Sequence, residues 1–320
     1  MFKFFVNYFI LTQIVHNCAI EFATQSESPW AALIMLPKNA RCGGALIYDQ
    51  FVITAAHCFD EIDFTDDAQW NEISVVLGEW IISTEPDCLV DEVYDYEGDL
   101  IKSCEFTAKA YPEQILIHDE YDVNLGNKKF KTDIAIIKLK WKPRKSVLIK
   151  NVELPRKAEC EKNSDGENVK FTGFGKIFIN GVTSFTDKKK KINMKIIENQ
   201  KCEIFFRGIE KSRVNSKIFC GLSQTVTCVG DSGSAVTKTT QDGKTILEGL
   251  LSFGAKQCHG QNFPAAFTKV ACFIEWIDSK ILELTLATSS QKPKPITIKT
   301  ETNDASDENS NENNVTVRDD

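Results

Sequence analysis

Residues 45–58 have the sequence Ala45-Leu46-Ile47-Tyr48-Asp49-Gln50-Phe51-Val52-Ile53-Thr54-Ala55-Ala56-His57-Cys58. Two short apolar runs lie on either side of Tyr48-Asp49-Gln50, a pattern that is typical of a β-hairpin. The second run leads directly to a histidine and a cysteine. This segment therefore predicts two neighbouring strands, with a candidate functional side chain just after the second.

Strand-like runs of the same kind recur between residues 28 and 286, separated by turn residues. They include residues 31–36, 73–78, 134–139, 169–173 and 246–253. Only one long segment has helical spacing, because its apolar residues recur at three and four positions; these are Phe273, Trp276, Ile277 and Ile281. Many short strands with one terminal amphipathic helix predict an all-β barrel or sandwich protein.

The composition is that of an ordinary soluble protein. The 320 residues are 42% hydrophobic and 26% charged, which excludes a fully disordered, collagenous or polytopic membrane protein. A formal net charge of −7 argues against a general nucleic-acid binder, because phosphate contacts need a basic face. Eleven cysteines indicate either metal binding or disulfide bonds in an oxidising compartment.

The two ends of the chain differ from the middle. Lys3 and the mostly apolar run 4–15 are typical of a secretory signal and too short to span a bilayer, so we expect residues 1–19 to be a cleaved signal peptide. Residues 287–320 lack aromatic residues and are rich in polar and acidic ones, which predicts a disordered acidic tail. Asn314 begins the single N-glycosylation sequon. The folded domain is then expected over residues 20–286 of a secreted, extracellular protein.

Three motifs contain residues capable of chemistry. They are Thr54-Ala55-Ala56-His57-Cys58, Asp133-Ile134-Ala135 and Gly230-Asp231-Ser232-Gly233. Taken singly, each has a structural explanation: a core histidine, a strand cap and a tight loop. Together, in the order His, Asp, Ser, they resemble the chymotrypsin-like (trypsin-fold) serine proteases. The resemblance extends from Pro29-Trp30 to Trp276-Ile277.

Within that family the sequence is most similar to the catalytic domains of arthropod clip-domain serine proteases. Leu77-Gly78-Glu79-Trp80, followed by the separated pair Cys88 and Cys104, resembles an extra disulfide loop of that branch. Only residues 20–28 lie between the predicted signal cleavage and Pro29, so we expect no clip module.

The resemblance implies a fold and a reaction. The fold is all-β, with two orthogonal six-stranded antiparallel β-barrels and a C-terminal α-helix. The implied reaction is peptide-bond hydrolysis through an acyl-enzyme, with Ser232 as nucleophile, His57 as general base and then acid, and Asp133 orienting the imidazole. The backbone N–H groups of Gly230 and Ser232 would form the oxyanion hole. We expect no cofactor and no metal ion.

The same resemblance pairs ten of the eleven cysteines and leaves Cys18 in the signal peptide. The expected bridges are Cys42–Cys58, Cys88–Cys104, Cys160–Cys272, Cys202–Cys220 and Cys228–Cys258.

The resemblance also places a specificity pocket beside Ser232. Val226 stands where trypsin-like members carry an aspartate, so a substrate arginine or lysine would lack a counter-charge there. Cleavage after medium or large apolar residues is therefore predicted. The expected substrate-binding residues are Val226, Ser252, Phe253, Gly254 and Ala265, and Ser252–Gly254 are also expected to pair with the substrate backbone.

Some features depart from the family pattern. Ser234 and Ala235 replace a usual glycine and proline, and both changes are small enough to be tolerated. No Ile-Val-Gly-Gly-like sequence precedes Pro29 to supply the ammonium that pairs, in the family, with the aspartate before the nucleophile, here Asp231. The run Lys188–Lys191 is interpreted as a solvated surface loop, with a basic exosite as the alternative.

Two functions stay open at this point. The first is a secreted serine endopeptidase whose partners are protein or peptide substrates, protein inhibitors and cascade proteins, without nucleic acid or membrane. The second is a non-catalytic or weakly active homologue that binds proteins as a regulator of an extracellular cascade in immunity or venom.

Overall fold

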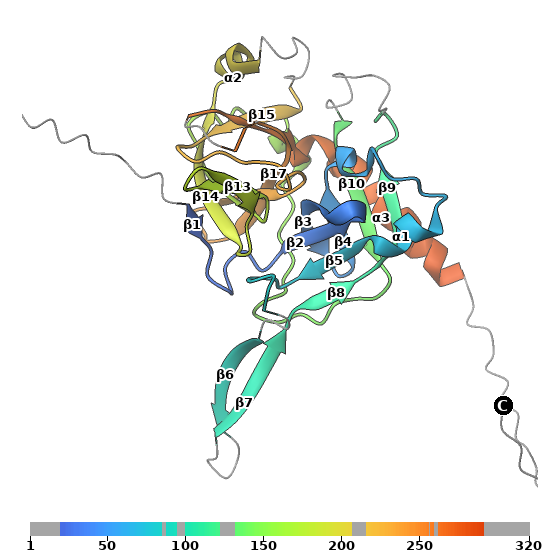
Figure 1. Cartoon of the computed structure of the whole chain (residues 1–320). Coiled ribbons are helices and arrows are strands. Elements are labelled where there is room, and N and C mark those ends of the chain that lie inside the picture. Colours follow the sequence, from blue (N-terminus) through green and yellow to red (C-terminus); the bar gives the residue numbers. More distant parts are fainter. Residues whose placement is uncertain are drawn as a thin grey trace, which may run out of the picture.

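The computed structural model of the chain describes residues 20–84, 88–94, 100–121, 132–206, 216–255, 257–258 and 262–290 (Figure 1). These residues form two seven-stranded sheets and two separate hairpins, and α-helices cover parts of their surface. The predicted signal peptide, the sequon at Asn314 and the side chains of Cys88 and Cys104 lie outside the described residues.

The N-terminal sheet curls on itself. Its strands, in spatial order, are β8 (Ala108–Ala110), β5 (Ser74–Leu77), β2 (Ala31–Leu36), β3 (Ala40–Tyr48), β4 (Phe51–Thr54), β10 (Ala135–Leu139) and β9 (Pro112–Ile117). The edge strands β8 and β9 are consecutive in the chain and are separated only by Tyr111. Because β8 pairs with β5 and β9 pairs with β10, the two edges of the sheet meet at one bent segment.

The C-terminal sheet is a closed six-stranded barrel. Its strands, in spatial order, are β14 (Lys190–Ile197), β11 (Asn168–Gly173), β16 (Ala235–Thr239), β17 (Thr245–Phe253), β18 (Ala265–Lys269) and β15 (Ile218–Leu222). A further pairing between β14 and β15 closes the ring. The short strand β1 (Glu21–Phe22) adds to the free edge of β14.

The helices are few. They are α1 (Asp67–Glu72), α2 (Asn199–Phe206) and α3 (Ile274–Ser290), with short 3₁₀ turns η1 (Pro37–Asn39), η2 (Ala56–Phe59), η4 (Lys157–Glu159) and η5 (Val270–Phe273). Two hairpins stand apart from the large sheets: β6 (Cys88–Tyr94) with β7 (Leu100–Phe106), which projects from the body in Figure 1, and β12 (Lys176–Ile179) with β13 (Val182–Phe185). None of the described helices combines the length and the apolar character needed to cross a membrane.

The predicted class, an all-β protein of two barrels with a C-terminal helix, is confirmed, one barrel being closed and the other a curled sheet. The predicted hairpin is also present, since Tyr48 pairs with Phe51 across a two-residue turn. The disordered tail was expected to begin at residue 287, but α3 continues to Ser290. No glycine or proline interrupts this segment before Pro293, so the helix has no reason to end at residue 286.

One apolar cluster joins the two sheets. It contains Ile53 and Ile136 from the curled sheet, Leu250 from the barrel, and Phe273 and Ile277 from the C-terminal segment. All five side chains are buried. Burying each large apolar side chain contributes about 1.5–3 kcal/mol, so this cluster fixes the barrel against the curled sheet and α3. The three predicted motifs are brought together along this junction.

Candidate active site

Strand pairing brings His57 to Asp133. Strands β4 and β10 run antiparallel with Thr54 opposite Ala135. His57 follows β4 within η2, and Asp133 lies two residues before the first residue of β10, so both lie at the same end of the pair. The ring Nδ1 of His57 lies 2.8 Å from Oδ2 of Asp133, and the backbone N–H of His57 donates to Oδ1 at 2.9 Å. Both carboxylate oxygens are therefore engaged by the same histidine.

The barrel holds Asp133 from its other side. The hydroxyl of Ser252, at the end of β17, donates to Oδ2 of Asp133, and the hydroxyl of Thr268, on β18, donates to the Asp133 carbonyl at 3.0 Å. Asp133 is completely buried. A carboxylate that accepts from several donors favours the tautomer with a proton on Nδ1, which leaves Nε2 of His57 as the hydrogen-bond acceptor.

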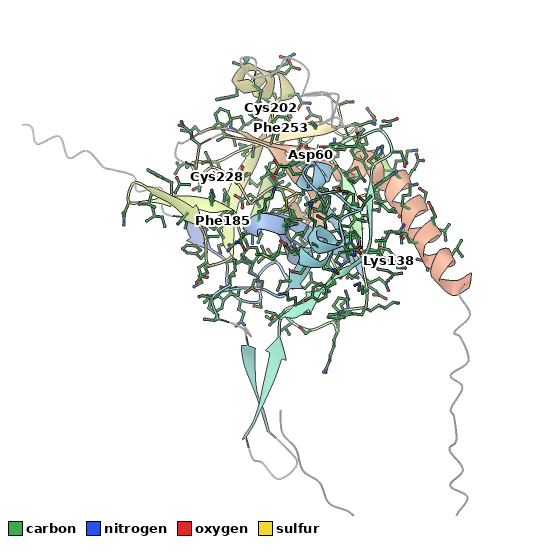
Figure 2. The ribbon with its side chains drawn as sticks, turned by 45° about the vertical axis from the view of Figure 1, so that its right-hand side comes forward. Asp60, Lys138, Phe185, Cys202, Cys228 and Phe253 are labelled. Atoms are coloured by element: carbon green, nitrogen blue, oxygen red, sulfur yellow. A yellow bond between two sulfur atoms is a disulfide. The ribbon has the colours of Figure 1, made fainter. Side chains whose placement is uncertain are left out.

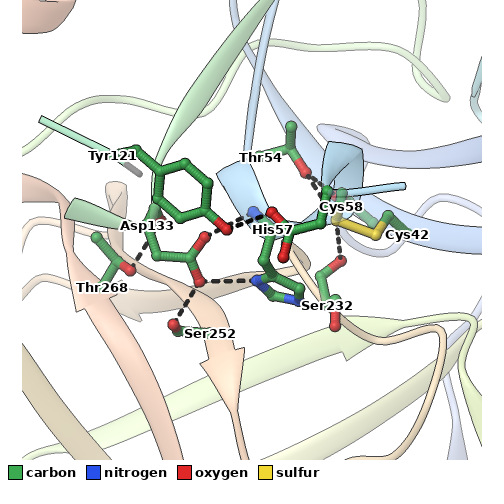
Figure 3. A network of polar contacts seen from close by, with 11 residues as sticks. Cys42, Thr54, His57, Cys58, Tyr121, Asp133, Ser232, Ser252 and Thr268 are labelled. Carbon is green, nitrogen blue, oxygen red and sulfur yellow. Dashed lines mark hydrogen bonds and ion pairs between the residues drawn. A yellow bond between two sulfur atoms is a disulfide. The ribbon is translucent and has the colours of Figure 1, made fainter. Parts of the chain in front are cut away.

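The loop 228–234 places Ser232 beside this pair. The backbone N–H of Gly43 donates to the Ser232 carbonyl at 2.7 Å, and Sγ of Cys58 lies 3.8 Å from the same oxygen. Cys58 is next to His57 in the chain, so Ser232 and His57 lie close together. Figure 3 shows the imidazole of His57 between the carboxylate of Asp133 and the side chain of Ser232. The three distant residues singled out by the sequence motifs thus meet at one place.

Gly230 adopts a backbone conformation that suits glycine alone. Its φ is +89°, and a Cβ at this position would lie 2.6 Å from a ring carbon of Phe185. Within the described ranges, the N–H groups of Gly230 and Ser232 donate to no protein acceptor. These are the two donors that the family resemblance assigns to an oxyanion hole.

Asp231 forms a buried ion pair that the sequence analysis missed. Nζ of Lys190 lies 2.6 Å from Oδ2 of Asp231, and the two side chains are 1% and 0% exposed. Lys189, its neighbour, is equally buried and donates to the Gln25 carbonyl at 3.1 Å. The prediction of a solvated lysine loop at 188–191 is therefore wrong. These residues lead into β14, where Lys190 alternates in phase with the buried Ile192.

The expected substrate-binding residues fall into two groups. Gly254 faces Ala265 and Thr227, the residue after Val226: a Cβ on Gly254 would lie 3.1 Å from Oγ1 of Thr227 and 3.8 Å from Cα of Ala265. Val226 and Ala265 are buried. These residues can form a narrow, largely apolar wall.

The other two predicted residues direct their side chains elsewhere. The hydroxyl of Ser252 contacts Asp133. The ring of Phe253 packs at 5.0 Å from that of Phe206 in a cluster that also contains Cys202 (Figure 2). Because these two side chains are engaged elsewhere, Ser252 and Phe253 can contact a substrate only through their backbone groups.

Two further polar residues near the site were missed from the sequence. The Tyr121 hydroxyl donates to Oδ1 of Asp60 at 2.5 Å, and Figure 3 shows the Tyr121 ring beside Asp133. Burial, and next the bond to Asp60, raises the pKa of Tyr121, so its hydroxyl stays a donor. Nothing in the sequence near either residue indicates this contact, because they are brought together only by the fold.

Four of the five predicted disulfide bonds are present among the described residues. They are Cys42–Cys58, Cys160–Cys272, Cys202–Cys220 and Cys228–Cys258. Two of them brace the site, since Cys58 follows His57 and Cys228 begins the loop that contains Ser232. The fifth expected pair, Cys88 with Cys104, has side chains outside the described residues, although their backbones lie on paired strands.

No group of three or more His, Cys, Asp or Glu side chains in the described ranges is arranged to hold a metal ion. The arrangement of His57 and Ser232 is suited to proton transfer and nucleophilic attack.

Ser234 carries a hydroxyl without a purpose that we can identify. The side chain is buried, and its Oγ has no hydrogen-bond partner within the described residues. It lies against Gly43, where a Cβ would meet this oxygen at 1.9 Å. Ser234→Ala is expected to raise the free energy of unfolding by about 1 kcal/mol, because a buried unpaired hydroxyl is removed at constant packing. Denaturant unfolding of the two chains measures this, and a loss of stability would contradict it.

A family model and several known proteins match most of the chain. A family model described as Trypsin matches residues 20–277. The chain is 31% identical to CLIP domain-containing serine protease HP8 of Bombyx mori over 264 residues, which cover 80% of this chain and 66% of that protein. It is 29% identical to Phenoloxidase-activating factor 3 of Holotrichia diomphalia over 264 residues, covering 80% and 69% of the two chains.

A third relative belongs to the same group. Melanization protease 1 of Drosophila melanogaster is 30% identical over 271 residues, which cover 81% of this chain and 64% of that protein. The chain thus spans 64–69% of the length of these three relatives. HP8 carries the name of a clip-domain serine protease, the branch that the sequence motifs predict.

Proposed function

The chain belongs to the trypsin family of serine proteases, and on that premise we propose that it is a secreted serine endopeptidase that uses His57, Asp133 and Ser232. The observation that carries the proposal is the contact between His57 and Asp133. One carboxylate oxygen of Asp133 meets the imidazole Nδ1 and the other meets the histidine backbone. A histidine fixed in this way presents Nε2 for proton transfer.

The proposed acylation step starts with proton transfer. Nε2 of His57 takes the proton of the Ser232 hydroxyl as Oγ attacks the scissile carbonyl, and the imidazolium then protonates the leaving amine. Asp133 stabilises the transient positive charge without itself taking the proton. In the second step water gives a proton to Nε2 of His57 as it attacks the acyl carbonyl. The imidazolium then returns a proton to Oγ of Ser232, and the acyl group leaves as the acid. The Ser252 hydroxyl holds the Asp133 carboxylate in this orientation, and the Thr268 hydroxyl holds the Asp133 backbone carbonyl.

The negative charge that develops on the substrate oxygen would be met by the N–H groups of Gly230 and Ser232. A preorganised donor pair of this kind stabilises the transition state more than the planar ground state. One such donor contributes about 3–4 kcal/mol. Gly230 has a positive φ of +89°, a conformation that a residue with a Cβ rarely adopts, so a glycine is needed at this place in the loop.

We propose that the enzyme cleaves after medium or large apolar residues. The wall formed by Val226, Gly254 and Ala265 offers no charge to a basic side chain, and burying an unpaired charge is strongly unfavourable. An apolar side chain gains from the same surroundings because it leaves water.

Val226→Asp is expected to shift this preference towards basic residues. A carboxylate at this position would supply the counter-charge that the wild-type wall lacks, so the ratio of kcat/KM for arginine over leucine substrates should rise roughly tenfold or more. Matched peptides that differ only at the residue before the scissile bond measure the ratio. An unchanged ratio in a folded variant would place the specificity pocket elsewhere.

Secretion and protein substrates complete the proposal. Four disulfide bonds among the described residues are typical of an oxidising, extracellular compartment. One relative is named a phenoloxidase-activating factor and another a melanization protease, which favours protein substrates in an extracellular cascade for this chain.

The test is the cleavage of a peptide library, with products identified by mass spectrometry. We expect defined cuts after leucine, methionine or phenylalanine for the wild-type chain and none for Ser232→Ala. Ser234→Ala is the matched control, because it removes a buried hydroxyl two residues away and should keep the cleavage pattern. Equal backgrounds in the wild-type chain and in Ser232→Ala would contradict the proposal and favour a non-catalytic, protein-binding homologue.

A further inference from the structure

A lysine side chain occupies the position from which a cation can control the proposed oxyanion hole. We propose that Lys190 is a positioning residue that holds the loop 228–234 in its competent arrangement, so that the chain is active without cleavage to create a new amino terminus. This inference rests on the proposed function, because it concerns the same loop.

The Asp231 carboxylate contacts two backbone N–H groups and one cation. Oδ1 accepts from the Gly175 N–H at 2.7 Å, and Oδ2 accepts from the Cys228 N–H at 2.8 Å and contacts Nζ of Lys190 at 2.6 Å. A Cβ on Gly175 would lie 2.4 Å from the Asp231 carboxyl carbon, so this wall is already in contact. Within the described ranges, Lys190 is the single cation that reaches this carboxylate. Another ammonium would have to displace it.

The fold gives Lys190 little freedom to leave. Its backbone pairs with Gly173 on β11 and with Phe22 on β1. Its Nζ also donates to the Lys176 carbonyl at 3.1 Å, so the ammonium has a second buried acceptor. The Lys190 ammonium therefore lies between two acceptors, the Asp231 carboxylate and the Lys176 carbonyl.

Asp231 is coupled directly to the proposed hole donors, because it lies between Gly230 and Ser232. Its N–H donates to the Cys228 carbonyl at 2.9 Å, and its carbonyl accepts from the Ser234 N–H at 3.0 Å. If the carboxylate lost its cation, it would be an unpaired buried charge, and the loop would have to rearrange to bring it to water. That rearrangement would move the N–H groups of Gly230 and Ser232 apart.

The competing source of the cation is a free amino terminus, which the family resemblance implies. The two sources make different demands. An amino-terminal ammonium must be freed by cleavage and stay unblocked, whereas the ammonium of Lys190 is present in the uncut chain. Blocking the terminus and removing the lysine therefore separate them.

The experiment measures the fraction of chains labelled by a fluorophosphonate, with kcat and KM for a peptide ester. For this experiment the chain is prepared uncut, with an added extension that blocks its amino terminus. Mass spectrometry checks that the extension stays intact. The variants are Lys190→Met, which removes the charge at similar length, and Lys190→Ala, assayed with and without added propylammonium. Lys191→Met is the matched control, since Lys191 contacts Glu27 at 3.1 Å and not Asp231.

We expect complete labelling of the blocked wild-type chain and of Lys191→Met. Lys190→Met should lose about 10²-fold to 10³-fold in kcat, the size expected for loss of one oxyanion-hole donor, with a smaller change in KM. Propylammonium should restore part of the activity of Lys190→Ala in a saturable way, which a merely structural defect would not allow.

Three outcomes would overturn the inference. Equal labelling of wild type and folded Lys190→Met would show that Lys190 does not position the loop, and the proposed function would be unaffected. Labelling that appears only after the blocked extension is cleaved would assign the role to the amino terminus, again with the proposed function intact. No labelling under either condition would refute the proposed function together with the inference. Labelling of the blocked wild-type chain involves no substitution, so this part of the test stays valid even if a variant fails to fold.

Discussion

Replacement of Ser232 by alanine is expected to lower kcat by roughly 10⁵-fold to 10⁶-fold while KM changes little. The substitution removes the proposed nucleophile and leaves the apolar wall and the N–H groups of the loop in place. Binding of a peptide should therefore persist without turnover. Steady-state kinetics on the best library peptide measure both constants.

Ser234→Ala is the control for this loss. It should keep kcat within a few-fold of wild type, because its hydroxyl contacts no group of the proposed relay. Residual activity of Ser232→Ala within tenfold of wild type would mean that another residue attacks the substrate, and the assignment would fail.

Asp133→Asn is expected to lower kcat by about 10⁴-fold, the size typical for loss of the carboxylate that orients a catalytic histidine. An amide at this position can offer only one oxygen, whereas the His57 ring, the His57 backbone and Ser252 all donate to the present carboxylate. The imidazole would then favour a proton on Nε2, where it cannot act as a base towards Ser232. The measurement is kcat together with the rate of phosphonate labelling.

Asp60→Asn gives a matched comparison, because it changes a nearby carboxylate to an amide that can still accept from Tyr121. It should keep most of the activity. If Asp133→Asn and Asp60→Asn had equal effects, the carboxylate of Asp133 would have no special role, and the relay would be contradicted.

Much of the fold could be predicted from local patterns. The apolar runs around Asp49-Gln50 pair as strands, and the spacing of Phe273, Ile277 and Ile281 marks the C-terminal helix. Such signals are local, since alternation and helical spacing depend on which face of an element is buried. What they cannot supply is the order of strands in a sheet. The curled sheet has edges that meet at Tyr111, and nothing near that residue in the sequence indicates it.

The candidate site was predictable for a different reason. His57, Asp133 and Ser232 were singled out by their order and motifs; strand pairing brings His57 to Asp133, and the contact of the loop 228–234 with Gly43 places Ser232 beside them. Residues that act through contacts across the fold were missed. Ser252 was expected to line a pocket, yet its hydroxyl contacts Asp133, which is 119 positions away in the chain.

Lys190 shows how a usually sound rule can fail. A run of lysines is normally solvated, because burying a charge without a partner is unfavourable. The alternation of Lys190, Ile192 and Met194 on one face of β14 was a signal that this lysine points inward. Its partner, Asp231, could not be found in this way, because it lies on a loop of another part of the barrel.

The most direct test of the account is to locate the covalent adduct of a fluorophosphonate on the folded wild-type chain by peptide mass spectrometry. The account predicts one adduct per chain, on Ser232, which disappears in His57→Ala even though the serine is still present. An adduct on another residue, or a labelling rate at Ser232 that does not depend on His57, would contradict the central claim that these side chains form one proton relay.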